Sequence, residues 1–269
     1  MSETIEAIDV HAHFGICKGN MNKLTNDFMS GEPQKVVHYA TMAHIKLTIV
    51  SPLHALMPRK GGDPVAGNIL ASGVTGENKE LLQWVVIDPL KKETYSQAAD
   101  MLKLPRCVGI KIHPEEHGYP IVKYGREIFE FAAKNNTVIQ THSGEQNSMP
   151  EDVVKFANEY PEVKVIVSHL GCGWDGDPGH QVSAILSSRH GNLYTDTSSA
   201  QSIKPNLIEW AVKEIGAEHI LFGTDSPLYF APMQRARIDN AEISYEDRKK
   251  ILFENALSLF GDAVKIYFY

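Results

Sequence analysis

Eight short segments rich in β-branched and apolar residues recur along the chain, and their ends lie about 25–40 residues apart. Each segment ends in polar or turn residues, and a stretch with the helical spacing of apolar residues follows. The predicted strands are Ile5–His11, Lys46–Ser51, Gln83–Asp88, Val108–His113, Thr137–His142, Val163–His169, Asn192–Thr197 and His219–Thr224. Because one strand–helix–strand step has this length, eight consecutive steps predict a single (β/α)8 TIM barrel.

The segments between the strands include seven predicted helices. They are Glu32–His44, Tyr95–Leu102, Tyr124–Asn135, Pro150–Tyr160, Gln181–Arg189, Pro205–Ile215 and Tyr245–Phe260. The 269 residues show no break in composition, which favours one domain over residues 1–269. An open doubly wound sheet is the alternative, but no glycine-rich fingerprint follows the first strand.

Composition excludes several classes of protein. The net charge is −7 and no basic stripe is interleaved with aromatic residues, so nucleic acid is not an expected partner. Apolar runs are far shorter than the roughly 20 residues that cross a bilayer. The acidic N-terminus lacks the basic and apolar regions of a secretory signal, and three widely spaced cysteines fit a reducing compartment. We therefore expect a cytoplasmic protein that acts on a small molecule.

Polar side chains gather at the ends of the predicted strands. In a barrel these ends form the active-site face. His11 and His13 alternate along the first strand, so both can reach one ion, and His142, His169 and Asp225 end three other strands. The alternative is a set of independently hydrogen-bonded core histidines, which would have to explain all five positions. Imidazoles and a carboxylate buried together favour a metal site.

Five sequence blocks carry a resemblance to a known family. They are Ile8–Gly15, Gly109–Pro114, Val167–Gly171, Leu221–Pro227 and Lys250–Gly261. Together they resemble the amidohydrolase superfamily, and more closely its amidohydrolase-2 branch of metal-dependent hydrolases and decarboxylases. The resemblance covers nearly the whole chain.

The resemblance implies a metal site and a pair of catalytic residues. His11, His13, His142 and Asp225 would hold one divalent ion, with Zn²⁺ expected and Mn²⁺ or a second ion as alternatives. His169 would lie beside them, as a ligand or next to one. Asp225 and His169 would be catalytic: Asp225 takes a proton from a metal-activated water, and His169 orients that water or polarises the substrate.

Lys111 and His113 leave alternatives open. In some branches of the superfamily a lysine on the fourth strand is carbamylated and bridges two metals, and Lys111 has a suitable position. An unmodified Lys111 would instead bind a substrate carboxylate or complete the polar layer of the barrel. We favour one metal and an unmodified lysine. His113 is expected to line the substrate pocket, or else to form a hydrogen bond within its loop.

The loops after the strands are expected to select the substrate. Phe14 and Trp174 are the predicted substrate-binding residues there. Further residues expected near the mouth are Cys17, His54, Tyr229 and Phe230. Possible partners for an anionic substrate are Arg59, Lys60, Arg235 and Arg237, for which solvated surface charge is the alternative.

Three functions are compatible with these features. The expected one is a metal-dependent hydrolase that cleaves an amide, lactone or ester bond of a small carboxylated metabolite. The alternative is non-oxidative decarboxylation, or hydration, of an unsaturated or aromatic acid. Short loops after the strands favour hydrolysis slightly. A catalytically silent barrel would have lost a ligand, whereas all five positions are filled. A homodimer formed through the outer helices is possible, but no sequence feature fixes the oligomeric state.

Overall fold

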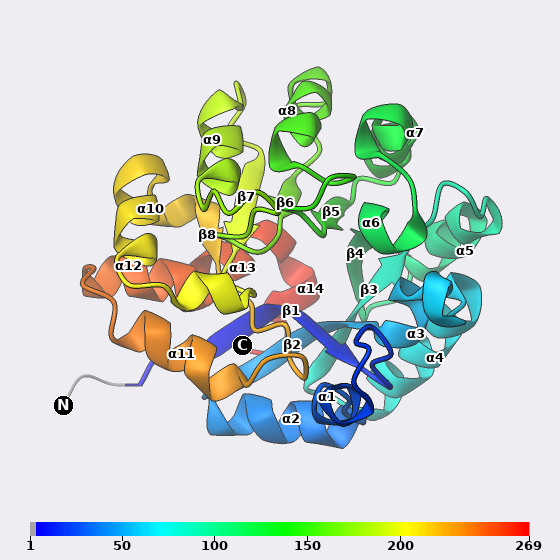
Figure 1. The fold of residues 1–269 in the computed structure, drawn as a ribbon, viewed down its shortest axis with the longest axis horizontal. Helices are drawn as coiled ribbons and strands as arrows, with labels where there is room; N and C mark the ends of the chain where they lie inside the picture. The colour runs from blue at the N-terminus through cyan, green and yellow to red at the C-terminus, as the bar shows by residue number, and fades with distance from the viewer. Residues whose placement is uncertain (1–3, 269) are drawn as a thin grey trace.

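The computed structural model describes residues 4–268 and contains one sheet of eight parallel strands in sequential order, β1 to β8, with helices around it (Figure 1). The strands are β1 (Ala7–Phe14), β2 (Ile45–Pro52), β3 (Leu81–Val86), β4 (Cys107–Ile112), β5 (Val138–Thr141), β6 (Val165–Val167), β7 (Leu193–Asp196) and β8 (Ile220–Leu221). Each strand pairs in parallel with the next along the chain.

Hydrogen bonds between β1 and the segment that begins with β8 close the barrel. The Val10 amide donates to the Phe222 carbonyl at 2.9 Å, and the Asp225 amide donates to the His11 carbonyl at 2.7 Å. Ala12 and Ser226 form a further parallel bridge. The predicted (β/α)8 fold is therefore confirmed.

Several predicted strand boundaries were wrong, and the errors at β1 and β8 affect the site. β1 continues to Phe14, so His11 and His13 both lie within the strand, whereas the prediction ended it at His11. β8 is only two residues long, because the backbone leaves the extended conformation and reaches a left-handed φ of 56° at Asp225. The functional aspartate thus stands on a turn after the strand.

Helices cover the outside of the barrel. The α-helices are α1 (Lys23–Phe28), α2 (Pro33–Met42), α3 (Leu53–Leu56), α4 (Pro64–Glu77), α5 (Glu93–Met101), α6 (Pro114–His117), α7 (Ile121–Lys134), α8 (Pro150–Glu159), α9 (His180–Ser187), α10 (Leu207–Ile215), α11 (Ala231–Asp239), α12 (Tyr245–Lys249), α13 (Asn255–Phe260) and α14 (Asp262–Lys265). Short 3-10 turns lie at η1 (Pro58–Lys60), η2 (Ala200–Ile203) and η3 (Ala217–His219), and a π-helix, η4 (Lys250–Glu254), joins α12 to α13. None of these helices is both long enough and apolar enough to cross a membrane.

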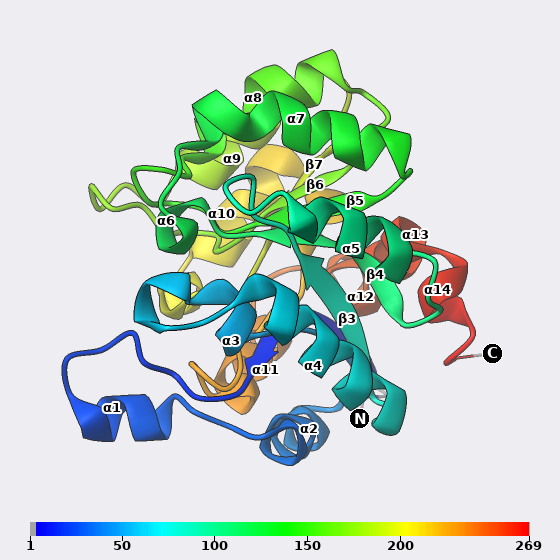
Figure 2. The same cartoon turned by 90° about the vertical axis from the view of Figure 1, so that its right-hand side faces the viewer.

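The two ends of the barrel differ in chemistry. At the N-terminal end, α13 and α14 pack against inward-facing apolar residues of the strands, opposite α1, α3 and α6 (Figure 2). Trp84 is fully buried there, stacks edge-to-face on Phe260 with ring centres 5.5 Å apart, and donates its indole N–H to the Val10 carbonyl at 2.8 Å. Apolar packing closes this end, so the buried polar side chains collect at the other one.

Candidate metal centre and active site

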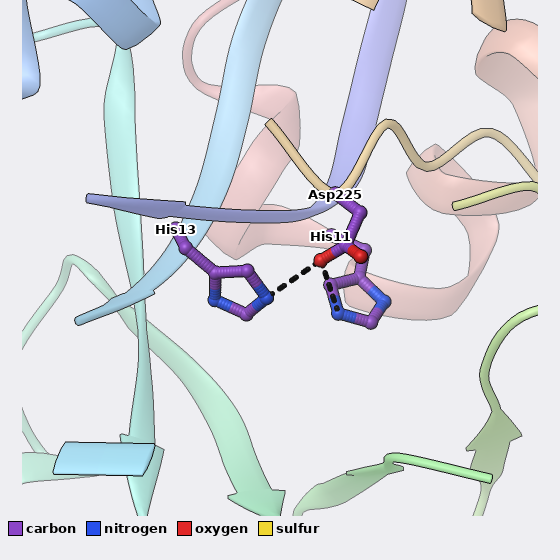
Figure 3. Close-up of side chains that lie close together, drawn as sticks. All are labelled: His11, His13 and Asp225. Atoms are coloured by element: carbon purple, nitrogen blue, oxygen red, sulfur yellow. Dashed lines mark ion pairs between the residues drawn. The ribbon is translucent and has the colours of Figure 1, made fainter. Parts of the chain in front are cut away.

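His11, His13 and Asp225 converge at the C-terminal end of the barrel (Figure 3). The Nε2 atom of His13 lies 2.8 Å from Oδ1 of Asp225, and the Nε2 atom of His11 lies 3.7 Å from the same oxygen. All three residues are buried, and their potential ligand atoms lie within 4.8 Å of one another. His11 and His13 lie on β1 and Asp225 follows β8, so the closure of the barrel between these two strands brings the three residues together.

The other ring nitrogens of the two histidines are already bonded. Nδ1 of His11 lies 2.9 Å from Oδ2 of Asp196, and Nδ1 of His13 lies 3.0 Å from the Ser51 carbonyl oxygen. With the Nδ1 protons donated to these oxygens, both Nε2 atoms are directed toward Asp225, where a cation could replace their present contacts with Asp225 and Lys111. Fixing a ring in this way is how proteins orient metal-binding histidines, so the donor set fits a divalent ion.

The protonation states of these groups suit a cation. Burial, with a smaller contribution from the Lys111 charge, lowers the pKa of His11 to about 4, so its imidazole is neutral at neutral pH. Burial raises the pKa of Asp225, but the hydrogen bond and charge of His13 outweigh it and bring the pKa to about 2. A neutral imidazole and an ionised carboxylate are the forms that bind metal.

Asp196 is a buried site residue that the sequence analysis missed. It accepts hydrogen bonds from the His11 ring and from the His169 amide, the latter at 3.0 Å, and also bonds to the Ser198 hydroxyl. With His11 and His169 it forms a second group of possible ligand atoms. The available signal was its place at the end of the predicted strand 192–197, since five other predicted strand ends carried functional candidates.

His142 and His169 are bonded to each other. Nδ1 of His142 lies 2.9 Å from Nε2 of His169, and Nε2 of His142 lies 3.0 Å from Oε2 of Glu145. The His142 ring also stacks on His113, with centres 4.0 Å apart. Both nitrogens of His142 are thus engaged outside the group of His11, His13 and Asp225, and its role as a ligand stays a prediction.

Lys111 projects into the same polar layer from β4. Its ammonium group lies 3.1 Å from Nε2 of His11 and 3.1 Å from Oε1 of Gln140. Burial lowers the pKa of this lysine to about 8, because the charged form loses its hydration. The contacts satisfy an unmodified amine, and they place it beside the potential metal ligands.

A cavity of about 230 Å³ opens over these groups. Its polar lining includes Lys111 and His113, the two predicted substrate-binding residues that the structure brings to the site. The cavity is also lined by Leu53, Leu56, Met57, Leu228 and Tyr229.

The other two predicted substrate-binding residues lie elsewhere. Phe14 is buried but lines a neighbouring pocket, because it is the last residue of β1 and follows the His pair by one position. Trp174 is 59% exposed in the loop after β6 and does not line the cavity. Of the further residues expected near the mouth, Tyr229 lines the cavity and His54 lines the neighbouring pocket.

None of the four basic residues considered as partners for an anionic substrate lines the cavity. Arg235 and Arg237 lie on α11 in ion pairs with carboxylates, and neither lines the cavity. Arg59 is paired with Glu116 at 3.0 Å. Lys60 lines the neighbouring pocket.

A family model described as amidohydrolase matches residues 8–261. The chain belongs to the amidohydrolase family. The predicted resemblance is therefore confirmed, and the fold, the family and the His/Asp group together support a metal-dependent enzyme.

Curated relatives of this amidohydrolase are decarboxylases. It is 32% identical over 118 residues to the gamma-resorcylate decarboxylase of Polaromonas sp. (strain JS666 / ATCC BAA-500), a match to 38% of this chain and 36% of that protein. It is 28% identical over 105 residues to the 2-amino-3-carboxymuconate-6-semialdehyde decarboxylase of Caenorhabditis elegans, a match to 37% of this chain and 25% of that protein. The matches thus span about a third or less of the relatives' lengths.

A solved structure extends the likeness of fold to the whole chain. The dihydroxybenzoic acid decarboxylase of Polaromonas sp. JS666, solved with bound manganese and the inhibitor 2-nitroresorcinol, superposes with a TM-score of 0.76 at 15% identity. The superposition covers 99% of this chain and 100% of that one.

These comparisons contradict the expected hydrolase and support the alternative. The relatives are decarboxylases, and a decarboxylase fold matches this chain almost from end to end. The short loops after the strands were therefore a wrong argument for hydrolysis, because a decarboxylase shares the fold of this chain over almost its whole length. Zinc, the expected metal, is not confirmed, and the solved neighbour holds manganese.

Proposed function

We propose that this amidohydrolase-family protein is a metal-dependent, non-oxidative decarboxylase of a small aromatic or unsaturated carboxylic acid. The observation that carries the proposal is the pair of imidazoles whose Nδ1 atoms are fixed by Asp196 and Ser51, so that both Nε2 atoms face Asp225. The local identity to gamma-resorcylate decarboxylase supports the reaction class.

His11, His13 and Asp225 would hold the ion, and the family resemblance adds His142 as a fourth ligand. When bound, a divalent ion supplies positive charge that neutralises the oxygens of an acidic substrate. Imidazole and carboxylate ligands suit either manganese or zinc, so the activity should be measured with each metal. His142 would have to release Glu145 or His169 in order to join the set.

Decarboxylation breaks the bond between a carbon atom and its carboxyl group, releases CO₂ and leaves an electron pair that must take up a proton. His169 and Asp225, which is ionised at neutral pH, are the proposed groups that take up a proton and pass it to this electron pair beside the cavity. His169 is connected through His142 to Glu145, whose side chain is 44% exposed. The three side chains form a hydrogen-bonded route for a proton from the rim to the cavity.

The side chains that line the cavity would assist this reaction in different ways. The apolar ones, which include Leu53, Leu56 and Leu228, would keep water from the substrate and weaken the solvation of its carboxylate. Lys111 and His113 would orient substrate oxygens. The mixed lining is therefore suited to a small acid with an apolar body.

The test is CO₂ release from a panel of hydroxybenzoates and unsaturated acids, with 2,6-dihydroxybenzoate included, by protein reconstituted separately with Mn²⁺ and Zn²⁺. We expect stoichiometric CO₂ and decarboxylated product, and loss of both in His169→Asn. Hydrolysis of lactones and amides is measured in parallel. Hydrolysis without CO₂ release from any acid would refute the proposal.

A further inference from the structure

A second pocket of about 310 Å³ adjoins the metal-site cavity. It lies between the loop that follows β1, the start of α2, and helices α3 and α4. Leu53 and Met57 line both spaces, so the two pockets share these side chains as a boundary. The mechanism proposed above makes no use of this second pocket.

The lining of the second pocket is largely apolar and includes two lysines, Lys18 and Lys60, which we call its basic rim. Its apolar lining residues include Phe14, Ile16, Leu53, Leu70 and Val74. Its charged lining residues are Lys18, Lys60 and Glu32, and the exposed His54 also contributes.

The two lysines of this rim are available to an anion. Within residues 4–268 neither Lys18 nor Lys60 takes part in an ion pair, whereas Arg59, next in sequence to Lys60, is held by Glu116. The lining contains two cationic side chains, Lys18 and Lys60, and one carboxylate, Glu32. The Glu32 side chain makes no hydrogen bond to the helix that follows it. The rim therefore carries net positive charge above an apolar surface.

From this arrangement we propose that the second pocket binds the far end of the substrate, an apolar chain or ring that ends in a second carboxylate. The inference rests on the proposed decarboxylase function and narrows its substrate to a dicarboxylic acid. The carboxyl group that is lost lies at His11, His13 and Asp225, and the one that is kept lies at Lys18 and Lys60.

The sizes of the two spaces and the nature of their boundary support a shared ligand. The metal-site cavity alone is smaller than the roughly 300–1,000 Å³ of typical small-molecule sites, and the two spaces together fall within that range. Met57 is unbranched and half-buried, and its methyl group lies 3.4 Å from the point where a Cβ on Gly19 would stand. A flexible thioether beneath a loop can move aside for a ligand that passes between the pockets.

The experiment compares two series of probes by titration calorimetry on the metal-loaded protein. One series is the 4-alkylbenzoates, and the other is the 4-(ω-carboxyalkyl)benzoates with the same number of methylenes. We expect affinity to rise about three- to four-fold for each methylene that becomes buried. At one chain length the terminal carboxylate should add a further gain of about two- to five-fold per lysine, which falls as salt is added.

Four variants and a control locate the gain. Lys18→Gln and Lys60→Gln should each remove part of the carboxylate gain and leave the methylene gain intact, whereas Glu32→Gln should increase the carboxylate gain. Leu70→Trp fills the pocket and should abolish both gains while benzoate still binds. Lys213→Gln removes an exposed lysine on α10 and should change nothing.

The outcomes separate this inference from the proposed function, because binding is measured without turnover. Dicarboxylates that bind no more tightly than the alkylbenzoates at every chain length would overturn the inference. So would a carboxylate gain that survives in Lys18→Gln, Lys60→Gln and Leu70→Trp. If CO₂ is released from hydroxybenzoates but the dicarboxylate gain is missing, the function stands and the inference falls. A gain that depends on the lysines supports the second pocket even if no acid of the panel is decarboxylated.

Discussion

The histidines of the site form two pairs that the fold holds in different ways. His11 and His13 lie within a strand, and each has one ring nitrogen bonded to an oxygen that belongs to the barrel framework. His142 and His169 follow the ends of β5 and β6 and are bonded to each other and to the partly exposed Glu145. The rings of the first pair are therefore oriented by the barrel framework, whereas the rings of the second pair are held by each other and by a side chain at the rim.

This difference suggests that the two histidine pairs have different roles. The β1 pair should determine metal affinity, because Asp196 and the Ser51 carbonyl already orient its two rings. The second pair should determine proton movement and turnover, because its bonds connect the rim to the cavity.

His13→Ala should lose the bound metal and reduce CO₂ release to background, because it removes an Nε2 ligand that lies 2.8 Å from Asp225. His142→Ala should keep most of the metal and lose turnover. Elemental mass spectrometry on protein purified without chelator measures the metal, and circular dichroism checks that both variants are folded. Equal metal loss in the two variants would show that the pairs do not differ.

Asp196→Asn should weaken metal affinity by about 10–100-fold, because it removes the carboxylate that orients the His11 ring. Competition with a chelating dye measures the affinity. Ser51→Ala is the matched control: it removes one contact of the His13 ring at 3.1 Å, but the Ser51 carbonyl still accepts at 3.0 Å. Its effect should therefore stay below about three-fold. Equal effects of the two substitutions would contradict the assigned role of Asp196.

The same contrast explains how much of the site could be predicted from the sequence. His11 and His13 could be predicted from the alternation of side chains along a strand, and Asp225 from its place at a strand end. Both are local patterns, and the structure brings the three residues together. Asp196 was missed although its strand was predicted, because a single aspartate at a strand end is ambiguous without its partner. Glu145 lies in a loop with no periodicity, and only the folded backbone places it next to His142.

The fold was predicted better than its individual helices. The order of strands follows from the repeated unit, but α4 was missed because its glycines favour a loop. The structure needs one of them: a Cβ on Gly67 would lie 2.6 Å from the Cβ of Ala55 in α3. Close packing between two helices therefore overrides local propensity, and no local pattern reveals such a contact.

Glu145→Gln should leave metal content unchanged and lower kcat by about ten-fold, below the 10²–10⁴-fold contribution of a direct general acid or base. The amide can still accept a hydrogen bond from His142, but it cannot take up a proton. Glu116→Gln is the control, because this neighbouring glutamate pairs with Arg59 and does not line the cavity. An unchanged kcat in Glu145→Gln would remove the rim from the proton route, and metal loss would place Glu145 with the metal-binding group instead.

The smallest effect is expected at His180, the first residue of α9, which forms ion pairs with one carboxylate on α8 and one in the loop after β6. Its Nδ1 lies 2.7 Å from Oε1 of Glu151 on α8, and its Nε2 lies 3.0 Å from Oδ1 of Asp175 in the loop. Burial lowers the pKa of His180, but the hydrogen bonds and charges of the two carboxylates outweigh it and raise the pKa above its usual 6.5. Both bonds require the imidazolium, because a neutral ring has only one N–H.

A raised pKa in the folded state means that the stabilisation is complete below pH 6.5 and is lost as the pH rises through the folded-state value. His180→Gln should therefore lower the free energy of unfolding more at pH 5.5 than at pH 8.5, by up to about 1 kcal/mol, since Glu151 and Asp175 are more than a third exposed. Urea unfolding of both proteins at the two pH values measures this. A destabilisation that is equal at both would mean that His180 supports the loop by packing alone, and that ion pairing does not hold the rim to α8.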